Sequence, residues 1–192
     1  MVTVRVVILP GNGCVNIRQA NWYGWLYDKL VDHYKEVIDF SCKCENMPDP
    51  FTAKESIWLP FIRKELLGDS CNIVVGHSSG AEAAMRLCEE TKVTGIVLCA
   101  ACHTDLGIES EAKAGYYNRP WNWESIIANT EFRIQLGSLN DRFIPFHEME
   151  HVRNSLEPIE FHKYETKDHF MYSKFPELFD IIVKKVDLYL KQ

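Results

Sequence analysis

The sequence has no long hydrophobic run, no strongly basic segment and no regular cysteine framework. No apolar stretch in its 192 residues reaches the roughly 18–20 residues that a membrane-spanning helix needs, and the N-terminus lacks the features of a signal peptide. A formal net charge of −6 without a basic stripe argues against nucleic acid as a partner. Seven cysteines at irregular spacing argue against a disulfide framework and favour a reducing, cytoplasmic setting.

Signatures of metal and nucleotide sites are also missing. Cys42 and Cys44 have no second Cys or His pair at zinc spacing. Residues 9–13 have neither the G-x-G-x-x-G spacing nor the Lys-Ser/Thr pair of a phosphate-binding loop. We therefore expect no metal and no cofactor. The 46% of hydrophobic and 25% of charged residues are ordinary for a globular protein, and the length suits one domain over residues 1–192.

Strand-like segments alternate with helical ones along the chain. The strands, rich in Val, Ile and Phe, are expected at residues 3–9, 36–41, 71–75, 94–99, 132–137 and 158–163. Helical spacing is found near residues 22–30 and 176–190, and Thr52 to Glu55 resembles a capping box that opens another helix. This alternation predicts a three-layer α/β/α sandwich with a mostly parallel sheet of about six strands. The longest irregular stretch, 100–120, follows the fourth strand, on the side where such sheets bind ligands.

Residues 76–80, Gly-His-Ser-Ser-Gly, join an apolar segment to a helical segment of small residues. A strand, a sharp turn and a helix in this order hold a serine hydroxyl out at the edge of a sheet, if glycines let the neighbouring backbone approach. Ser78 is therefore the predicted nucleophile, and the amide of Ser79 is predicted to stabilise an oxyanion. His77 is expected to shape the turn. Taken alone, the segment also fits a glycine-serine turn without catalysis.

A serine nucleophile needs a base and an acid that orients it, and in such sheets these follow later strands in the order serine, acid, histidine. Asp141 is the only carboxylate of the loop after the fifth strand, and His169 lies in the loop after the sixth. Taken singly, Asp141 fits a cap for a helix near Pro145, and His169 fits an ordinary loop histidine. Three loops in the required order favour a triad of Ser78, Asp141 and His169.

The loop after the first strand offers a second oxyanion donor. Two glycines flank Asn12, so its backbone amide can lie exposed beside the serine. We expect the Asn12 amide to be this donor, with Gly13 as the alternative, and Gly11 and Gly13 to contact substrate. Trp121 and Trp123 follow the long loop above the sheet. Tryptophans are more often core residues, yet these two are candidates for the wall of an apolar acyl or aromatic pocket.

Several longer motifs occur in order along the chain. They are Pro10-Gly11-Asn12-Gly13, Trp22-Tyr23-Gly24-Trp25, Asn46-Met47-Pro48-Asp49-Pro50, Glu55-Ser56-Ile57-Trp58-Leu59-Pro60-Phe61, Asp105-Leu106-Gly107 and Arg119-Pro120-Trp121-x-Trp123, together with the serine segment. With these motifs, nearly the whole chain resembles the retinoblastoma-binding protein 9 family of small serine hydrolases. The resemblance implies a minimal α/β-hydrolase fold without a large lid, a triad on Ser78, Asp141 and His169, and esterase- or amidase-like hydrolysis.

The chain departs from that family at two places. The L-x-C-x-E segment that binds the retinoblastoma protein is absent, because residues 66–71 read Leu-Leu-Gly-Asp-Ser-Cys, so this partner is not expected. Asp168 stands where the family usually has glycine, and a carboxylate there would affect the protonation of His169 or shift its loop.

The sequence thus predicts a serine hydrolase that cleaves small ester or amide substrates with apolar or aromatic groups through an acyl-enzyme. One alternative is a catalytically weak protein with the hydrolase fold that acts by binding a protein partner. The other is a flavodoxin-like nucleotide or flavin binder.

Overall fold

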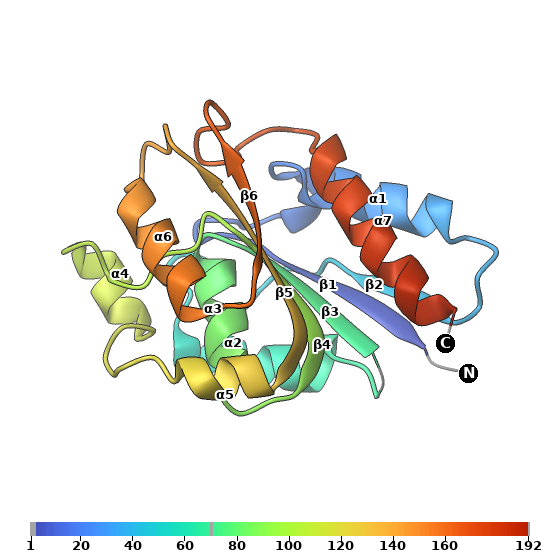
Figure 1. The fold of residues 1–192 in the computed structure, drawn as a ribbon, viewed down its shortest axis with the longest axis horizontal. Helices are drawn as coiled ribbons and strands as arrows, with labels where there is room; N and C mark the ends of the chain where they lie inside the picture. Colours follow the sequence, from blue (N-terminus) through green and yellow to red (C-terminus); the bar gives the residue numbers. More distant parts are fainter. Residues whose placement is uncertain (1–2, 70, 192) are drawn as a thin grey trace.

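The computed structural model describes residues 3–69 and 71–191, so Ser70 of the segment 66–71 lies outside the described residues. Within them, six strands form one sheet in the order β2-β1-β3-β4-β5-β6, and every neighbouring pair is parallel (Figure 1). The strands are β1 (Val4–Leu9), β2 (Phe40–Lys43), β3 (Cys71–His77), β4 (Val93–Cys99), β5 (Thr130–Ser138) and β6 (Glu160–Tyr164). The predicted α/β sandwich is confirmed.

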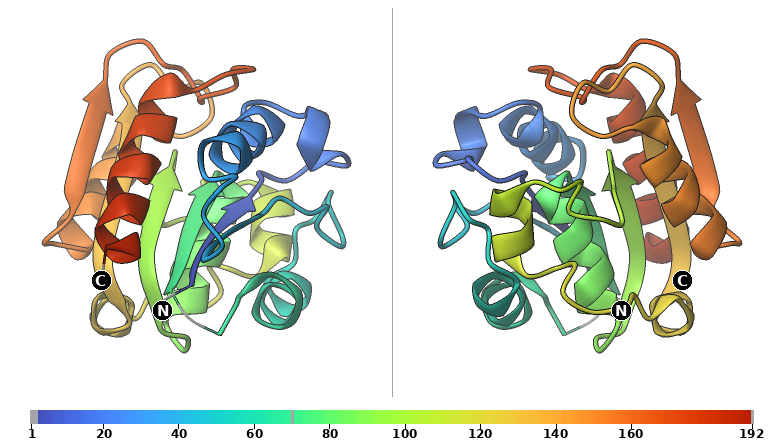
Figure 2. Two further views of the ribbon diagram at one scale, coloured as in Figure 1. Left: turned by 90° about the vertical axis from the view of Figure 1, so that its right-hand side faces the viewer. Right: turned by 90° about the vertical axis from the view of Figure 1, so that its left-hand side faces the viewer.

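Helices cover both faces of the sheet (Figures 1 and 2). One face packs against α1 (Tyr23–His33) and α7 (Pro176–Leu190). The opposite face packs against α2 (Glu55–Phe61) with its π-helical continuation (Ile62–Leu66), α3 (Ser79–Cys88), α5 (Trp123–Ala128) and α6 (Phe146–Ser155). A short 3-10 helix (Ile17–Gln19) and α4 (Glu109–Ala114) lie in loops, and no large lid is inserted among the described residues.

Two hydrophobic cores separate the helices from the sheet. All seven residues of β4 are buried, because both faces of this central parallel strand are covered. Trp22 fills the core under α1 and α7, and Trp58 fills the core on the other face; both are fully buried. Burying one large apolar side chain contributes roughly 1.5–3 kcal/mol to folding. The runs of Val and Ile that mark the strands in the sequence therefore reflect burial on two sides.

Three local predictions differ from the structure. The second strand begins at Phe40 rather than at residue 36, because the apolar Ile38 lies in a turn with its side chain 97% exposed. The capping box is wrong: α2 begins at Glu55 with Lys54 as N-cap, and no side chain caps it. The stretch 100–120 is not wholly irregular, since α4 lies within it.

The strand order reverses between β1 and β3. Because the connections after these strands leave in opposite directions, a crevice opens at their carboxyl ends, and ligands bind there in open α/β sheets. The loop at residues 10–13 and the serine segment both begin at this edge, toward which the strand arrows point in Figure 2.

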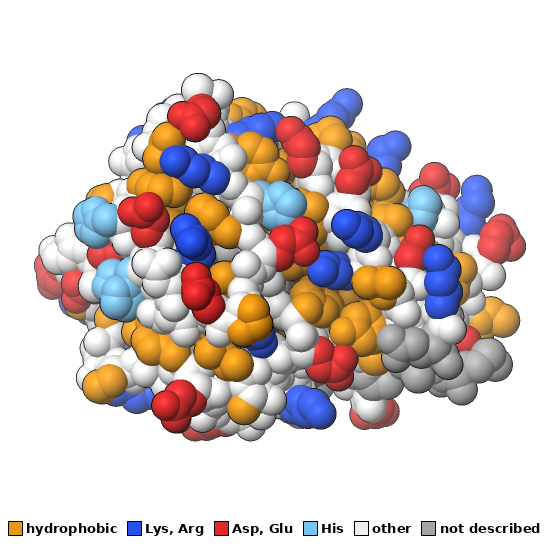
Figure 3. Space-filling model, viewed as in Figure 1, with side chains coloured by type: hydrophobic (Ala, Val, Ile, Leu, Met, Phe, Trp, Pro, Cys, Tyr) orange, Lys and Arg blue, Asp and Glu red, His pale blue; other side chains and the backbone are white. Residues whose placement is uncertain are grey.

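The surface shown in Figure 3 carries acidic and basic side chains interspersed among apolar ones. Across residues 3–69 and 71–191, no helix combines the length and the apolar character that crossing a bilayer requires.

Candidate active site

Ser78 occupies a strained turn between β3 and α3. Its backbone has φ 53° and ψ −126°, a region that non-glycine residues rarely adopt and that costs about 1–3 kcal/mol. Backbone hydrogen bonds hold it there: its amide donates to the carbonyl of Cys99 at 3.0 Å, and its carbonyl accepts from the amides of Ala81 at 2.6 Å and Glu82 at 3.3 Å. These contacts maintain the strained backbone conformation of the turn that holds the Ser78 hydroxyl.

The two glycines around Ser78 are required by close backbone contacts. A Cβ atom at Gly76 would lie 2.3 Å from the carbonyl oxygen of Gly80. One at Gly80 would lie 2.5 Å from the carbonyl oxygen of Leu9. The expectation that glycines at both positions let neighbouring backbone approach is confirmed, and the second contact brings α3 against the end of β1.

Asp141 and His169 form a hydrogen-bonded pair. His169 Nδ1 lies 2.8 Å from Asp141 Oδ2, and the Asp141 side chain is fully buried. Asp141 Oδ1 accepts the amides of Phe143 and Ile144, both at 2.9 Å. Asp141 is not a helix cap, because α6 begins at Phe146 with Pro145 as N-cap. One carboxylate oxygen thus organises its own loop while the other faces the histidine.

Ser78 and His169 line the same cavity, with a volume of about 440 Å³. Because Nδ1 of His169 is engaged by Asp141, Nε2 is the ring nitrogen left for a partner in the cavity. Among the described residues, no hydrogen bond joins the Ser78 hydroxyl to this ring. Catalytic hydrogen bonds are often long before substrate binds.

The amides of the loop after β1 have different partners. The Gly13 amide donates to the carbonyl of Pro50 at 2.7 Å, which removes it as a free oxyanion donor. The Asn12 amide makes only a long contact, 3.4 Å, with Ser79 Oγ beside Ser78. The amide of Ser79 itself belongs to the first turn of α3, where amides have no partner within the helix. Of the predicted donors, Asn12 and Ser79 remain suitable.

Both Gly11 and Gly13 line the cavity. A Cβ at Gly11 would lie 3.3 Å from Ser78 Cβ and 3.7 Å from its hydroxyl oxygen. The absence of a side chain here keeps Ser78 open to the cavity.

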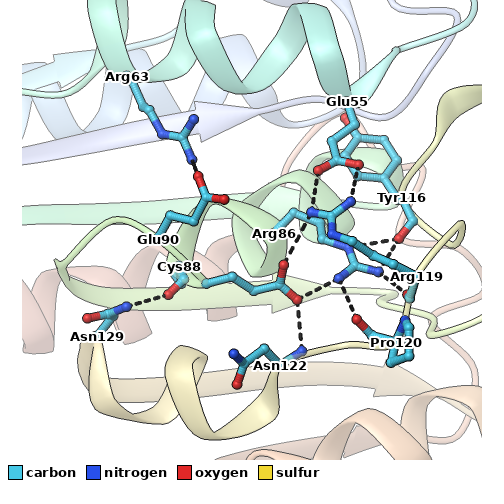
Figure 4. A network of polar contacts seen from close by, with 11 residues as sticks. Glu55, Arg63, Arg86, Cys88, Glu90, Tyr116, Arg119, Pro120, Asn122 and Asn129 are labelled. Atoms are coloured by element: carbon cyan, nitrogen blue, oxygen red, sulfur yellow. Dashed lines mark hydrogen bonds and ion pairs between the residues drawn. The ribbon is translucent and has the colours of Figure 1, made fainter.

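Neither Trp121 nor Trp123 is among the described residues that line this cavity, contrary to the sequence expectation. The segment before them is held against α3 by the buried Arg86 (Figure 4). Arg86 donates to three backbone carbonyls, those of Tyr116, Arg119 and Pro120. Its guanidinium carbon also lies 3.7 Å from the centre of the Trp121 ring, which stacks on Trp123. Trp121 therefore covers a buried cation and Trp123 packs on Trp121, away from the cavity lining.

Two carboxyl groups in the cavity were missed by the sequence analysis. Glu82 lies in the first turn of α3, four residues after Ser78, and both line the cavity; this spacing was a usable signal. Burial raises the pKa of Glu82 well above its ordinary value, although the amide of Cys102 donates to its Oε1 at 2.9 Å. Burial also raises the pKa of Glu111, which accepts from the side-chain amide of Asn12 at 2.8 Å. No Lys or Arg is among the described lining residues.

The Asp168 carboxylate does not pair with the imidazole of His169, whose Nδ1 faces Asp141. It forms an ion pair with Arg142 and accepts the Arg142 amide at 3.2 Å, and hydrogen bonds from Arg142 lower the pKa of this carboxyl. Its backbone has φ 47°, a left-handed conformation that suits glycine and that aspartate tolerates better than most residues. The departure from glycine is thus accommodated by the turn, and the carboxylate is neutralised by a neighbouring arginine.

Comparison with known proteins places the chain in a family. Serine hydrolase RBBP9 of Rattus norvegicus is 43% identical over 178 residues, which are 93% of each chain. The ydeN gene product of B. subtilis has a TM-score of 0.82 at 19% identity, over 96% of this chain and 100% of that one. Mouse alpha/beta hydrolase domain-containing protein 10 has a TM-score of 0.63 at 14% identity, over 97% and 90%. No family model matches.

The structural matches establish an α/β-hydrolase fold. Since more than two fifths of the residues are identical across almost all of both sequences, the chain belongs to the family of serine hydrolases that includes rat RBBP9.

Proposed function

We propose that the protein hydrolyses small esters or amides through an acyl-enzyme on Ser78. The observation that carries the proposal is the Asp141–His169 hydrogen bond at the edge of a cavity that also exposes the strained Ser78. His169 Nε2 takes the Ser78 proton as the serine oxygen attacks the substrate carbonyl. The amides of Asn12 and Ser79 stabilise the oxyanion, and His169 then protonates the leaving alcohol or amine.

Deacylation uses the same groups. Water loses a proton to His169 Nε2 and attacks the acyl carbon, after which the proton returns to Ser78 as the acid is released. Asp141 keeps the proton of the ring on Nδ1 and stabilises the imidazolium in both halves of the reaction. Apart from the imidazole of His169, no side chain of the site has to change its charge during the two steps.

The lining of the cavity supports small substrates with apolar or aromatic groups. Its apolar side chains include Leu106, Ile108, Phe143, Ile144 and Met171. A volume of about 440 Å³ lies within the range typical of small-molecule sites.

We propose a reducing, cytoplasmic setting, which is supported by the state of the cysteines. All seven are free thiols.

Cys14 and Cys102 line the cavity, and burial raises the pKa of both thiols, which makes them poor competitors of Ser78 as nucleophiles at neutral pH.

Fluorophosphonate labelling tests the proposal. Ser78 Oγ is expected to form a bond to phosphorus as fluoride leaves, with the serine proton taken by His169. Intact-protein mass spectrometry should show one adduct, located on the peptide that contains Ser78, and Ser78→Ala should show none.

The matched control is Ser79→Ala, which removes the neighbouring hydroxyl but keeps the amide proposed for the oxyanion. It should still be labelled. A folded wild-type protein that takes no label and hydrolyses no ester would contradict the proposal and favour the alternative, a binding protein with a hydrolase fold.

The acidic lining predicts discrimination by charge. An acyl group with its own carboxylate would lose its hydration in a cavity that has no Lys or Arg among the described lining residues and already holds Glu111, so we expect mono-p-nitrophenyl succinate to have a kcat/KM at least about 10-fold below that of p-nitrophenyl butyrate at pH 8. Glu111→Gln keeps an acceptor for Asn12 and should reduce the difference between the kcat/KM values of the two esters. Glu109→Gln on the same helix removes an exposed charge outside the lining and should leave the ratio unchanged. Equal kcat/KM values for both esters would contradict an acidic pocket.

A further inference from the structure

His77, directly before the nucleophile, uses both nitrogens of its ring. Nε2 lies 2.8 Å from the backbone oxygen of His169, and Nδ1 lies 2.5 Å from the hydroxyl of Tyr23. A carbonyl only accepts, so Nε2 must carry a proton. Burial lowers the pKa of His77 to about 3, so the ring is neutral and Nδ1 has a lone pair. Tyr23 therefore donates to His77.

The hydroxyl of Tyr23 is also an acceptor. The backbone amide of Gly11 donates to it at 3.1 Å, and the side-chain amide of Asn21 donates at 3.2 Å. The Gly11 amide donates to Tyr23, the Tyr23 hydroxyl donates to His77 Nδ1, and His77 Nε2 donates to the carbonyl of His169, so the hydrogen bonds run in a single direction. They lead from the amide of Gly11 through Tyr23 and His77 to the carbonyl of His169. A protonated His77 would break this order, since Tyr23 would then have to accept a third bond.

The two ends of this chain of hydrogen bonds are parts of the proposed catalytic machinery. Gly11 precedes Asn12, the proposed oxyanion donor, and its Cα faces Ser78. His169 lies between Asp168 and Phe170, whose φ angles of 47° and 53° are both left-handed, so its loop needs external contacts to hold its shape. The indole of Trp22 supplies one such contact by donating to the carbonyl of Phe170 at 3.0 Å.

We propose that Tyr23 and His77 are positioning residues: their hydrogen bonds hold the oxyanion loop and the loop of His169 in fixed places on either side of Ser78. This inference rests on the proposed function. It assigns both residues an effect on the rate of the chemical step, exerted through the backbone of residues 11 and 169. The competing interpretation is that the two rings only fill the core, where they contact Trp22 and each other.

Variants that keep the rings but remove the hydrogen bonds separate these interpretations. Tyr23→Phe and His77→Phe are each expected to lower kcat for p-nitrophenyl butyrate about 10- to 100-fold with KM changed by less than about twofold. The reason is that displaced loops would weaken the contacts made to the transition state while leaving the binding of the substrate nearly unchanged. The rate of fluorophosphonate labelling should fall in parallel. His77→Gln retains an N–H donor and an oxygen acceptor and should recover most of the loss. The double Phe variant should be no slower than the slower single variant, since one break already disconnects the two loops.

The matched control is Tyr34→Phe. Tyr34 is also buried and loses hydrogen bonds to Asp187 and Val183, but it lies at the far end of α1. It should lower the melting temperature and leave kcat unchanged. Folded Tyr23→Phe protein that is labelled at the wild-type rate would overturn the proposal, as would multiplicative losses in the double variant. Failure of the wild-type protein to be labelled would instead contradict the proposed function.

If the Phe variants do not fold, a measurement on the wild-type protein still tests the order of hydrogen bonds on which the proposal rests. The ¹⁵N shifts of the His77 ring, assigned by comparison with His77→Gln, should show protonation at Nε2 alone from pH 5.5 to 8. A proton on Nδ1, or a charged ring in this range, would reverse the order of the hydrogen bonds and overturn the proposal.

Discussion

Asp141→Asn is expected to lower kcat about 10⁴-fold in a protein that still folds. The two amides that bind Oδ1, those of Phe143 and Ile144, would hold the carboxamide oxygen in the same place. The new NH₂ group would then face His169 Nδ1, which in the wild-type protein carries the hydrogen of the 2.8 Å bond to Asp141. Two donors cannot share this position, so the ring must move its proton to Nε2. It can no longer accept the proton of Ser78. Steady-state kinetics with a neutral ester measure the loss.

The neighbouring carboxylate provides the matched control. Asp168 pairs with the exposed Arg142 and not with the imidazole of His169, so Asp168→Asn should reduce kcat by less than about tenfold, as expected when one exposed ion pair is lost. Ser78→Ala, alone or combined with Asp141→Asn, should reach the same residual rate, because the groups of a triad act as a unit. Equal effects of the two Asp→Asn changes would remove Asp141 from the proposed role.

Gly80→Ala is expected to destabilise the fold by several kcal/mol and to abolish fluorophosphonate labelling. The added methyl would lie 2.5 Å from the backbone oxygen of Leu9, at the end of β1, and 2.6 Å from that of Pro10, in the loop that carries Asn12. Relief of these contacts requires α3 to move away from β1, and this motion separates Ser79 from Asn12. Urea denaturation gives the stability, and mass spectrometry gives the labelling.

Gly107→Ala is the control for the conformational effect of alanine. Gly107 has φ 71°, so alanine is strained there, but its Cβ would meet no atom within 4 Å. We expect a loss of about 1–2 kcal/mol and unchanged labelling. If Gly80→Ala costs no more than Gly107→Ala, the close contact between α3 and β1 is not what requires glycine.

The sequence was most informative where function depends on local backbone geometry. A serine between two glycines after an apolar strand predicts a strained turn, because few residue types can occupy such a turn. The spacing of strands and helices likewise predicts the sandwich, and 43% identity to a serine hydrolase places it in a family. The same logic fails for the capping box at residues 52–55, since a local pattern competes there with the packing of α2 and with the hydrogen bond from the Lys54 amide to Asp49.

Other features depend on residues that are distant in the sequence. Trp121 and Trp123 follow a loop above the sheet, yet the buried Arg86, more than 30 positions earlier, draws their segment onto α3. Asp168 is adjacent to His169 in the chain, but its carboxylate faces Arg142 because the backbone is left-handed there.

The order of residues along the chain thus determined the class of fold, the strained serine and the three loops that follow strand ends, because each depends on short-range conformational preferences. Only the tertiary structure decided which amide after β1 stays available, that the Asp168 carboxylate pairs with Arg142, and that Tyr23 and His77 join two loops. These outcomes depend on the directions of side chains and on competition among hydrogen-bond partners brought together from distant segments. Spacing along a chain does not specify such directions.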